Sequence, residues 1–373
     1  MNSERRQPTV AIAHDYLTQR GGAERVVLTL MKAFPEAAVH TTLYDPEGTY
    51  PEFSEANVIT SPLNRVGALR RDHRRALPLL APTASRLRVE ADVTIVSSSG
   101  WAHGFDIPGR SVVYCYSPAR WLYDSERYLG APAHTSATGI GLMALRPALV
   151  RWDKRAAARA DRYLAISEVV RDRIRSTYGL DADVVPAPHS MDAAAAQEPI
   201  SELLDWQDGY LLLVSRLLPY KNVDVAIDAA RQYGRRLVVI GRGPEEARLR
   251  AALPANVRML NGLTDEQMRW AYAHADVLVA PSHEDFGLTP LEAAAFAVPT
   301  VALRGGGYLD TIVEGETGLF FDRPEPKDIA AALAHSDRLD WDNDRLRARA
   351  EEFGEARFIA RIRSIALDEG RGS

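Results

Sequence analysis

Short apolar runs alternate with helical patterns along the whole chain, and this alternation limits the fold more than any other feature of the sequence. In the first half the apolar runs cover residues 10–13, 39–43, 93–96, 112–116 and 163–166. A second series follows a Pro- and Ala-rich interval and covers residues 210–214, 237–240, 257–260, 277–280, 300–303 and 319–321. Buried parallel strands joined by helices produce this pattern, so we predict an α/β fold with two doubly wound sheets.

The break between the two series indicates two domains. A chain of 373 residues is about twice the usual size of one domain, which supports the same division. We predict Rossmann-like domains at residues 1–190 and 200–355, followed by an amphipathic helix at 356–373 that can cross back to the N-terminal domain. Because ligands bind beyond the carboxyl ends of parallel strands, two facing sheets would form a cleft between the domains.

Composition excludes several classes of protein. The formal net charge of −5 argues against a dedicated nucleic-acid binder. The single cysteine, Cys115, allows no intrachain disulfide, and only four apolar residues precede His14, too few for the core of a signal peptide. No apolar run approaches the roughly 20 residues of a membrane helix. We therefore expect a cytoplasmic protein whose contact with a membrane, if it has one, is peripheral.

Two glutamates, Glu284 and Glu292, follow the apolar run at 277–280 in an E-x7-E pattern that leads into a helix. The start of a helix presents free backbone amides and a positive dipole end to an anion. We predict that this backbone binds a phosphate and that Glu292 accepts hydrogen bonds from sugar hydroxyls. The alternative is that both acids only stabilise the helix start. The backbone expected to bind the phosphate belongs to Phe286, Gly287, Leu288 and Thr289.

Two cations, Arg216 and Lys221, stand five positions apart after the first apolar run of the second domain. Arg supplies a planar fork and Lys a mobile point charge, a combination suited to a diphosphate. The alternative, a solvated charged loop, is weakened because this loop and the loop of Glu284 both follow strands of one predicted sheet.

These motifs together resemble the retaining glycosyltransferases of family 4, which have the GT-B fold. The resemblance covers nearly the whole chain, and the opening residues 14–26 and the segment 97–105 are most similar to bacterial mannosyltransferases of polysaccharide or lipid-linked glycan assembly. The chain departs from that subgroup at 116–121, where Tyr-Ser-Pro-Ala-Arg-Trp replaces the usual His-Thr-Pro-x-Arg-Tyr, and at His103, where Lys is common. The motifs that carry the resemblance are E-x7-E at 284–292, R-x4-K at 216–221, Gly241-Arg-Gly243-Pro, Gly21-Gly22 and Gly305-Gly306-Gly307.

The resemblance implies a function for most of these residues. It places Glu292 on the nucleotide ribose, Glu284 near the donor sugar, and Arg216 with Lys221 on the diphosphate, so that the last three would be catalytic. The loop of Gly241 and Gly243 would line the nucleotide pocket; its third glycine is absent, so a dehydrogenase is not indicated.

Five further residues are expected in the N-terminal, acceptor-side domain. Gly21 and Gly22 would let the backbone approach the donor phosphate or the acceptor, although an ordinary strand-to-helix turn would use them too. His103 would be catalytic, through contact with the donor sugar or the developing charge; the alternative is an ordinary surface or buried histidine. Asp15 and Tyr16 are expected on the acceptor side.

The sequence shows no metal motif and calls for no cofactor. The Asp-x-Asp patterns at 181–183, 340–342 and 342–344 lie away from the anion loops, and no histidine spacing matches a metal site. Arg216, Lys221 and a helix start can offset the charge of a diphosphate without a divalent ion.

Residues 64–90 contain seven arginines against Asp72 and Glu90, with apolar residues between them. Such a segment can dock on an anionic membrane surface at the inner face of the membrane. A solvated helix with its apolar side on the core is the alternative.

We therefore predict a retaining hexosyltransferase that uses GDP-mannose as donor and a hydroxyl of a glycan, a lipid-linked molecule or a small molecule as acceptor. Two alternatives stay open. One is a GT-B sugar-nucleotide epimerase or hydrolase, and the other is a catalytically silent partner that binds a sugar nucleotide.

Overall fold

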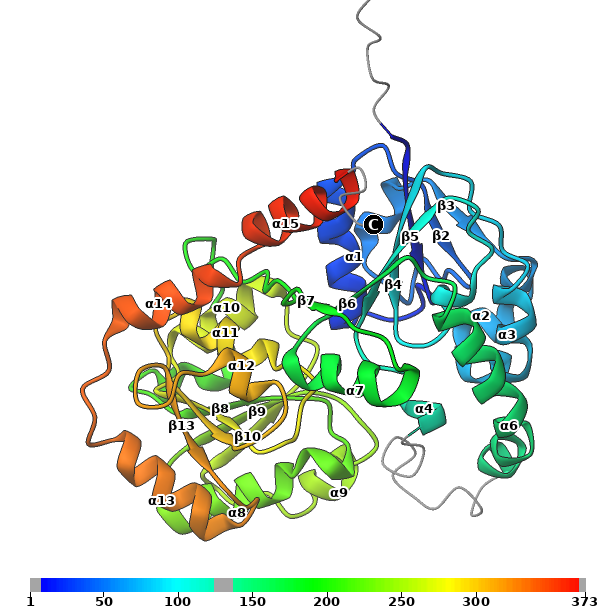
Figure 1. The fold of residues 1–373 in the computed structure, drawn as a ribbon. Coiled ribbons are helices and arrows are strands. Elements are labelled where there is room, and N and C mark those ends of the chain that lie inside the picture. Colours follow the sequence, from blue (N-terminus) through cyan, green and yellow to red (C-terminus); the bar gives the residue numbers. More distant parts are fainter. Residues whose placement is uncertain (1–7, 124–136, 369–373) are drawn as a thin grey trace, which may run out of the picture. The chain divides into compact units, whose positions relative to one another are not determined.

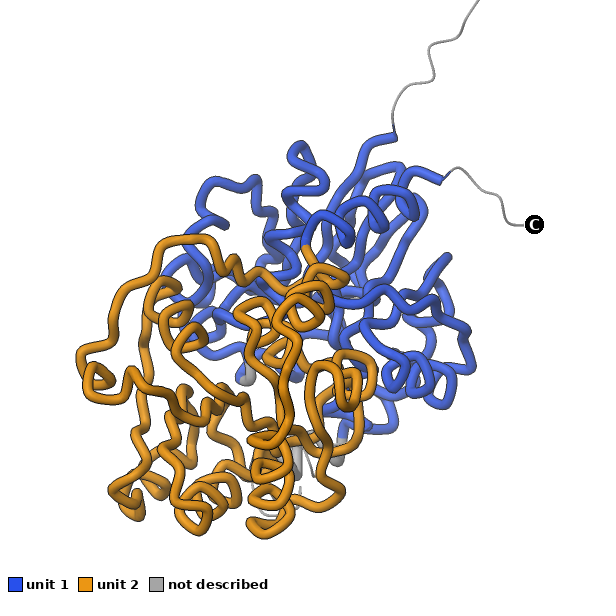
Figure 2. The backbone as a smooth tube through the Cα atoms, turned by 90° about the vertical axis from the view of Figure 1, so that its left-hand side faces the viewer, with its two compact units in different colours: residues 1–187, 355–373 blue, residues 188–354 orange. Residues whose placement is uncertain are grey.

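The computed structural model describes residues 8–123 and 137–368. They belong to two compact units, which Figure 2 shows in different colours. The first unit contains residues 1–187 and 355–373, and the second contains residues 188–354. Each unit is built on its own parallel β-sheet.

The sheet of the first unit has seven parallel strands in the order β3-β2-β1-β4-β5-β6-β7 (Figure 1). The chain therefore adds strands on one side of β1, then returns to the other side with β4. The strands are β1 Val10–His14, β2 Val39–Thr41, β3 Val58–Thr60, β4 Val93–Ser98, β5 Arg110–Cys115, β6 Arg162–Ala165 and β7 Asp183–Val184.

Helices connect these strands. Helix α1 begins right after the glycine turn, with Val26, Val27 and Leu30 buried on one face. The helices of the unit are α1 Gly22–Ala33, α2 Gly67–Arg71, α3 Leu77–Ala84, α4 Arg120–Tyr123, α6 Ala137–Ala157, α7 Glu168–Tyr178 and α15 Glu355–Leu367.

Helix α15 follows the whole second unit in sequence but packs in the first unit. It lies against α1, where Lys32 and Glu355 form an ion pair of 2.7 Å. The ring of Phe358 meets the edge of the Tyr114 ring on β5, with centroids 5.5 Å apart. The apolar side of α15, with Ile362 fully buried, is thus part of the core of the first unit.

The sheet of the second unit has six parallel strands in the order β10-β9-β8-β11-β12-β13. Alternate residues of β8 belong to two different apolar clusters: Leu213 packs in one cluster and Leu212 packs in the other. The sheet is therefore covered on both faces. The strands are β8 Leu211–Val214, β9 Leu237–Ile240, β10 Val257–Leu260, β11 Val277–Ala280, β12 Thr300–Leu303 and β13 Gly318–Phe321. The helices are α8 Val223–Tyr233, α9 Glu246–Arg250, α10 Asp265–Ala273, α11 Leu288–Ala295, α12 Tyr308–Thr311, α13 Pro326–Ser336 and α14 Asn343–Glu352.

The predicted α/β class with two doubly wound sheets is confirmed, and each predicted strand is present. The sequence pattern missed β3 and β7, because strands of three and two residues at the edges of a sheet carry no continuous apolar run. In both sheets the strand order reverses once, between β1 and β4 and between β8 and β11. Loops that follow these strand pairs are the expected place for ligands.

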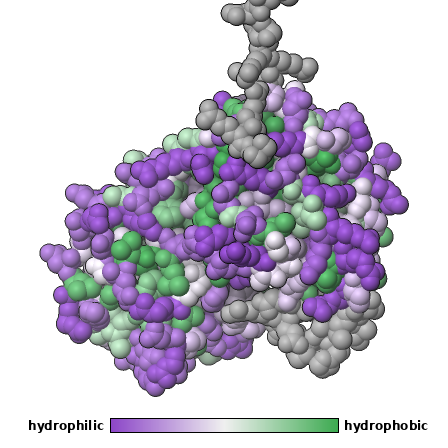
Figure 3. Space-filling model, in the orientation of Figure 1, coloured by the Kyte–Doolittle hydropathy of each residue, from purple (hydrophilic) through white to green (hydrophobic). Residues whose placement is uncertain are grey.

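The arginine-rich segment 64–90 forms several short helical pieces. Its apolar side is partly used by the core, because Ala76 and Leu80 are buried in a cluster with Trp101. Val66 and Leu79 stay exposed, at 48% and 46%. Figure 3 shows a face of the molecule on which hydrophilic residues predominate and hydrophobic ones form small groups.

Candidate functional site

Two adjacent strands position the polar loops of the second unit. Because β8 pairs with β11, the loop after β8 and the loop after β11 leave the same edge of the sheet side by side. The first loop carries Arg216 and Lys221, and the second carries Glu284. The sequence prediction that these residues share one edge of the sheet therefore agrees with the topology.

Lys221 and Glu284 form an ion pair across these loops. The ammonium of Lys221 donates to Oε1 of Glu284, and the Ser282 hydroxyl donates to the same oxygen over 2.5 Å. Lys221 is only 7% exposed, whereas Arg216 is exposed. The two predicted cations thus differ: one is buried and paired with a carboxylate, and the other faces solvent.

Asn222 connects the same two loops through its side chain. Its φ of 53° lies in the left-handed region, which asparagine tolerates better than most residues. Its side-chain amide donates to the Pro281 carbonyl over 2.8 Å. Asn222 therefore ends the loop of Lys221 at a fixed place beside the loop of Glu284.

Glu292 lies in α11, about two turns beyond Glu284. The Tyr272 hydroxyl on α10 donates to Oε2 of Glu292 over 2.7 Å. Burial, followed by the charge of Glu292, raises the pKa of Tyr272 well above its usual value, so the tyrosine remains a donor. One carboxylate oxygen of Glu292 is thus held by the protein.

Glycines allow the loops around α11 and α9 to pack closely. A Cβ at Gly287, whose φ is 90°, would lie 2.5 Å from the Tyr308 ring. A Cβ at Gly241 or Gly243 would lie 1.8 Å from the Ser215 carbonyl oxygen or 2.2 Å from that of Leu217. Gly241 and Gly243 therefore support the loop that carries Arg216, a structural need that the sequence analysis did not foresee.

The side chains of the predicted phosphate loop have mixed surroundings. Phe286 is 5% exposed, with its ring 6.0 Å from that of Phe353, so its side chain belongs to the core. Leu288 and Thr289 form the first turn of α11 and are partly buried. Any contribution of this segment to phosphate binding would come from its backbone, as the sequence analysis expected.

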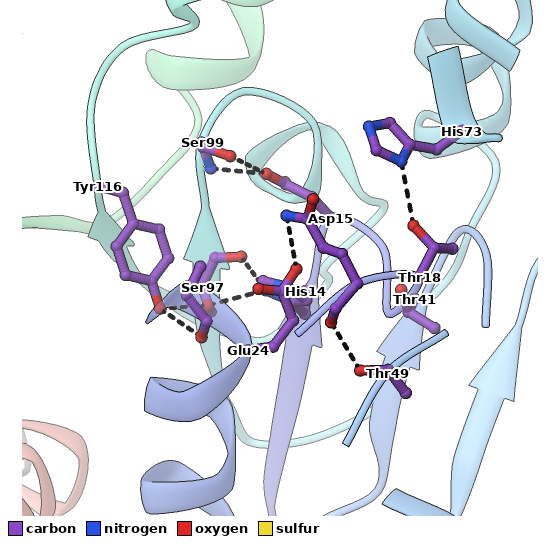
Figure 4. A network of polar contacts seen from close by, with 12 residues as sticks. His14, Asp15, Thr18, Glu24, Thr41, Thr49, His73, Ser97, Ser99 and Tyr116 are labelled. Atoms are coloured by element: carbon purple, nitrogen blue, oxygen red, sulfur yellow. Dashed lines mark hydrogen bonds and ion pairs between the residues drawn. The ribbon is translucent and has the colours of Figure 1, made fainter. Parts of the chain in front are cut away.

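In the first unit, a polar network occupies the carboxyl edge of β1 and β4 (Figure 4). The carboxylate of Asp15 is 1% exposed and accepts five hydrogen bonds from the segment that follows β4. The donors are the hydroxyls of Ser98 and Ser99 and the backbone amides of Ser99, Trp101 and Ala102. Asp15, expected on the acceptor side, therefore holds the loop after β4 and leaves little of its carboxylate for a ligand.

The same network contains a buried pair that the sequence analysis missed, His14 and Glu24. Nε2 of His14 lies 3.9 Å from Oε1 of Glu24, and the two side chains are 3% and 1% exposed. Nδ1 of His14 lies 2.9 Å from the Ser97 hydroxyl, which also contacts the Tyr116 hydroxyl (Figure 4). Burial by itself lowers the pKa of His14, but the polar interaction with Glu24, the charges of Glu24 and Asp15, and the Ser97 carbonyl together outweigh it, so the pKa is raised overall.

Glu24 also explains one glycine of the turn. A Cβ at Gly21 would lie 2.6 Å from Oε2 of Glu24, while the φ of Gly21, −130°, suits any residue. The Glu24 carboxylate therefore lies at the start of α1. This is the place where the backbone of Gly21 and Gly22 was expected to approach the donor phosphate or the acceptor. The only sequence signal for this carboxylate was an acid in the first turn after Gly21-Gly22, a common feature of helices.

His103 is buried, at 7% exposed, in a short 3-10 helix after β4. Its Nε2 lies 3.0 Å from Oδ1 of Asp153 on α6, and its Nδ1 lies 3.3 Å from the Ser98 hydroxyl. Asp153 is itself fully buried and accepts from the Tyr123 hydroxyl over 2.6 Å. These contacts match the alternative of a buried histidine with protein partners, and they favour a positioning function for His103 over contact with the donor.

Tyr16, the other residue expected on the acceptor side, is partly buried and stacks on the His73 ring, with centroids 4.0 Å apart. Gly22 is exposed as the first residue of α1.

Among residues 8–123 and 137–368, no group of three or more His, Cys, Asp or Glu side chains could hold a metal ion. Within the same residues, no helix has the length and apolar character needed to cross a membrane.

The fold and the polar loops at both reversal points define a class of protein, the two-unit α/β proteins of the GT-B type. The crystal structure of HepE from Anabaena in complex with UDP shares this fold, with a TM-score of 0.66 over 96% of this chain and 99% of that chain at 17% identity. At this identity the likeness concerns the fold alone.

Family comparisons then identify the particular group. The family described as Glycosyltransferase Family 4 matches residues 20–194, and that described as Glycosyl transferases group 1 matches residues 197–353. The chain belongs to glycosyltransferase family 4, as its motifs had indicated.

Curated relatives are similar over part of their length. A glycogen synthase of Thermus thermophilus is 31% identical over 213 residues, which are 51% of this chain and 49% of that protein. A GDP-mannose-dependent alpha-mannosyltransferase of Mycolicibacterium smegmatis is 31% identical over 248 residues, 60% of this chain and 63% of that protein. The chain thus spans about half the length of the first of these relatives and less than two thirds of the second.

The raised pKa of His14 leads to a pH-dependent stability. Because the folded protein binds this proton more tightly than the unfolded chain does, the stabilisation is present below the usual histidine pKa of about 6.5 and is lost as the pH rises through the folded value. We expect the melting temperature of the wild type to fall more between pH 6 and pH 9 than that of His14→Gln.

A thermal melt of both proteins across this range measures the difference, and the other titrating groups cancel in it. One proton changes the free energy of unfolding by at most about 1.4 kcal/mol per pH unit. Glu24→Gln should show the same reduced dependence. Parallel curves for wild type and His14→Gln would contradict the pairing of His14 with Glu24.

Proposed function

We propose that this protein transfers a hexose from a nucleoside diphosphate sugar to a hydroxyl acceptor with retention of the anomeric configuration. Family membership supports the transfer, and the loops of Arg216 and Glu284 in the second unit support a nucleotide-sugar donor. Mannose from GDP-mannose is the proposed donor sugar, on the similarity to the mycobacterial GDP-mannose-dependent enzyme. UDP-hexoses come next, because a structural neighbour was solved with UDP.

The observation that carries the proposal is the placement of Arg216, Lys221 and the start of α11 at the strand reversal of the second sheet. An exposed guanidinium, a buried ammonium and a helix start can together offset the charge of a diphosphate. As the bond between the anomeric carbon and the diphosphate breaks, these groups would stabilise the growing negative charge. No metal ion is required in this scheme.

We further propose a front-face reaction. The acceptor oxygen forms its bond to the anomeric carbon on the face from which the diphosphate departs, and the hydroxyl proton passes to the departing diphosphate. This reaction needs no carboxylate of the protein to act as a nucleophile on the opposite face of the sugar. His103 and Asp15 act in this scheme by holding the loop that follows β4.

Product analysis with a panel of GDP-, UDP-, ADP- and dTDP-hexoses tests the proposal. A new glycoside supports transfer, an epimer or free sugar supports an epimerase or hydrolase, and binding without turnover supports a silent partner. Arg216→Ala should lower turnover at least about tenfold, because the leaving-group charge loses its exposed partner.

The matched control is Arg231→Ala, an exposed arginine on α8 whose partner is Asp228. It should turn over like the wild type. Wild-type turnover in a folded Arg216→Ala protein would remove Arg216 from the site.

Glu292 is proposed to accept hydrogen bonds from the ribose hydroxyls through the carboxylate that Tyr272 holds. Charge-assisted hydrogen bonds contribute about 1.5–3 kcal/mol, so Glu292→Gln should weaken binding of the free nucleoside diphosphate roughly ten- to a hundredfold. Tyr272→Phe should weaken it less, because the carboxylate stays charged but loses its orientation. Calorimetric titration measures both variants.

A dideoxynucleoside diphosphate, which lacks both ribose hydroxyls, is the control ligand. The three proteins should bind it with similar affinity. If Glu292→Gln binds the ribonucleotide as tightly as the wild type does, Glu292 is not a ribose ligand.

We also propose peripheral docking on the anionic, cytoplasmic face of a membrane through residues 64–90. Arg65, Arg71 and Arg86 are exposed there, together with Val66 and Leu79. Arg88 contributes less, because it pairs with Glu90 and Asp106.

Cosedimentation with vesicles tests the docking. The protein should bind phosphatidylcholine vesicles that contain about 30% phosphatidylglycerol and not pure phosphatidylcholine, and Arg65→Ser/Arg71→Ser should bind roughly thirtyfold more weakly at about 1 kcal/mol per cation. The same change at two exposed arginines of the second unit, Arg231 and Arg248, should have little effect. Equal loss in both double variants would show that only the total charge matters.

A further inference from the structure

The ion pair of Lys221 and Glu284 has a consequence for nucleotide binding. Lys221 is 7% exposed and its ammonium lies against a carboxylate, so the charge expected to attract a diphosphate is already compensated. The side chain of Glu284 is 24% exposed and its Oε1 receives a second donor, the Ser282 hydroxyl. The carboxylate is therefore a stable member of this loop pair.

A diphosphate that contacts Lys221 would come close to this carboxylate. Two like charges near one ammonium repel each other, and the repulsion is large where water is largely excluded. Lys221 has three N–H donors and can hold a phosphate oxygen beside Glu284, but it cannot neutralise both charges. Arg216, on the exposed part of the loop, can compensate only part of the diphosphate.

The loops offer Lys221 little freedom to avoid this conflict. Asn222, next in sequence, is tied to the Pro281 carbonyl, and the backbone amide of Lys221 donates to the Leu218 carbonyl over 3.0 Å. The ammonium also lies 4.9 Å from the centre of the Tyr220 ring. The backbone of Lys221 is thus fixed beside the loop of Glu284, and its ammonium lies between the Glu284 carboxylate and the Tyr220 ring.

We propose that Glu284 makes the site discriminate between the sugar nucleotide and the nucleoside diphosphate product, by opposing the free diphosphate. This inference rests on the proposed function. While a donor sugar is bound, its hydroxyls donate to Glu284 and offset the repulsion. After transfer the sugar has left, Glu284 loses these donors, and its pairing with Lys221 favours release of the diphosphate.

A purely structural Glu284 predicts the opposite sign. If the carboxylate only holds Lys221 in place, Glu284→Gln should loosen Lys221 and weaken binding of the diphosphate. If Glu284 opposes the diphosphate, the same change should tighten it. The amide of Gln keeps the size of the side chain and can still accept from Lys221 and Ser282.

The experiment is calorimetric titration of GDP and UDP, and of GDP-mannose and UDP-glucose, into wild type and Glu284→Gln. We expect the variant to bind the diphosphate that the wild type prefers at least about fivefold more tightly. Its affinity for the corresponding sugar nucleotide should stay equal or fall, so the preference for donor over product is reduced. The gain should shrink as KCl is raised, since screening weakens the repulsion that the variant lacks.

Ser282→Ala is the matched control, because it removes a hydrogen bond from the same oxygen of Glu284 and leaves the charge. It should not tighten diphosphate binding. Glu284→Ala serves as a second charge-removing variant with the same expected sign if Glu284→Gln does not fold.

An unchanged or weaker affinity for the diphosphate in a folded Glu284→Gln protein would overturn the inference and leave the proposed function intact. A wild type that binds none of the four ligands would overturn the proposed function, and the inference with it.

Discussion

Parallel pairing between strands that are far apart in sequence controls the rest of this structure. In each sheet the chain completes one side and then returns to pair beside its first strand, β1 with β4 and β8 with β11. The backbone hydrogen bonds of these pairs bring together loops that are separated by about 80 residues in the first unit and 60 in the second. The polar residues of both units lie on these loops, so their chemistry depends on this one feature of strand order.

Carboxylates at both reversal points are held by neighbouring donors. Burying a carboxylate without partners is costly, and each of these has specific partners. Backbone amides and serine hydroxyls donate to Asp15, the Gln19 amide donates to Glu24 with His14 nearby at 3.9 Å, and Lys221 donates to Glu284. In the first unit the bonds fix the loop after β4. In the second unit the partner of the carboxylate is Lys221, the same ammonium that is proposed to contact the diphosphate. In our proposal this shared use of Lys221 connects donor binding with product release.

The glycines of the family motifs allow close packing within the protein. Gly241 and Gly243 leave room for the carbonyl groups of the loop that carries Arg216, and Gly21 leaves room for the carboxylate of Glu24. In these cases the contact is between parts of the protein, and the absence of a Cβ is what permits it. Substitutions at these glycines are therefore expected to act first on loop position and only through it on ligand binding.

The sequence by itself determined the two α/β units, the strands of both sheets except the short edge strands β3 and β7, and the neighbourhood of Arg216, Lys221 and Glu284. It could do so because apolar periodicity is local and because the order of parallel strands follows simple rules. Only the tertiary structure decided that the buried His103 contacts Asp153 and that Glu284 forms an ion pair with Lys221. It also decided that the Glu24 carboxylate lies close to both Gly21 and His14. His103 and Asp153, and Lys221 and Glu284, are distant in sequence and meet only when the sheets form. His14 and Glu24 are closer in sequence, but their contact depends on how α1 packs against the end of β1, which no apolar pattern records.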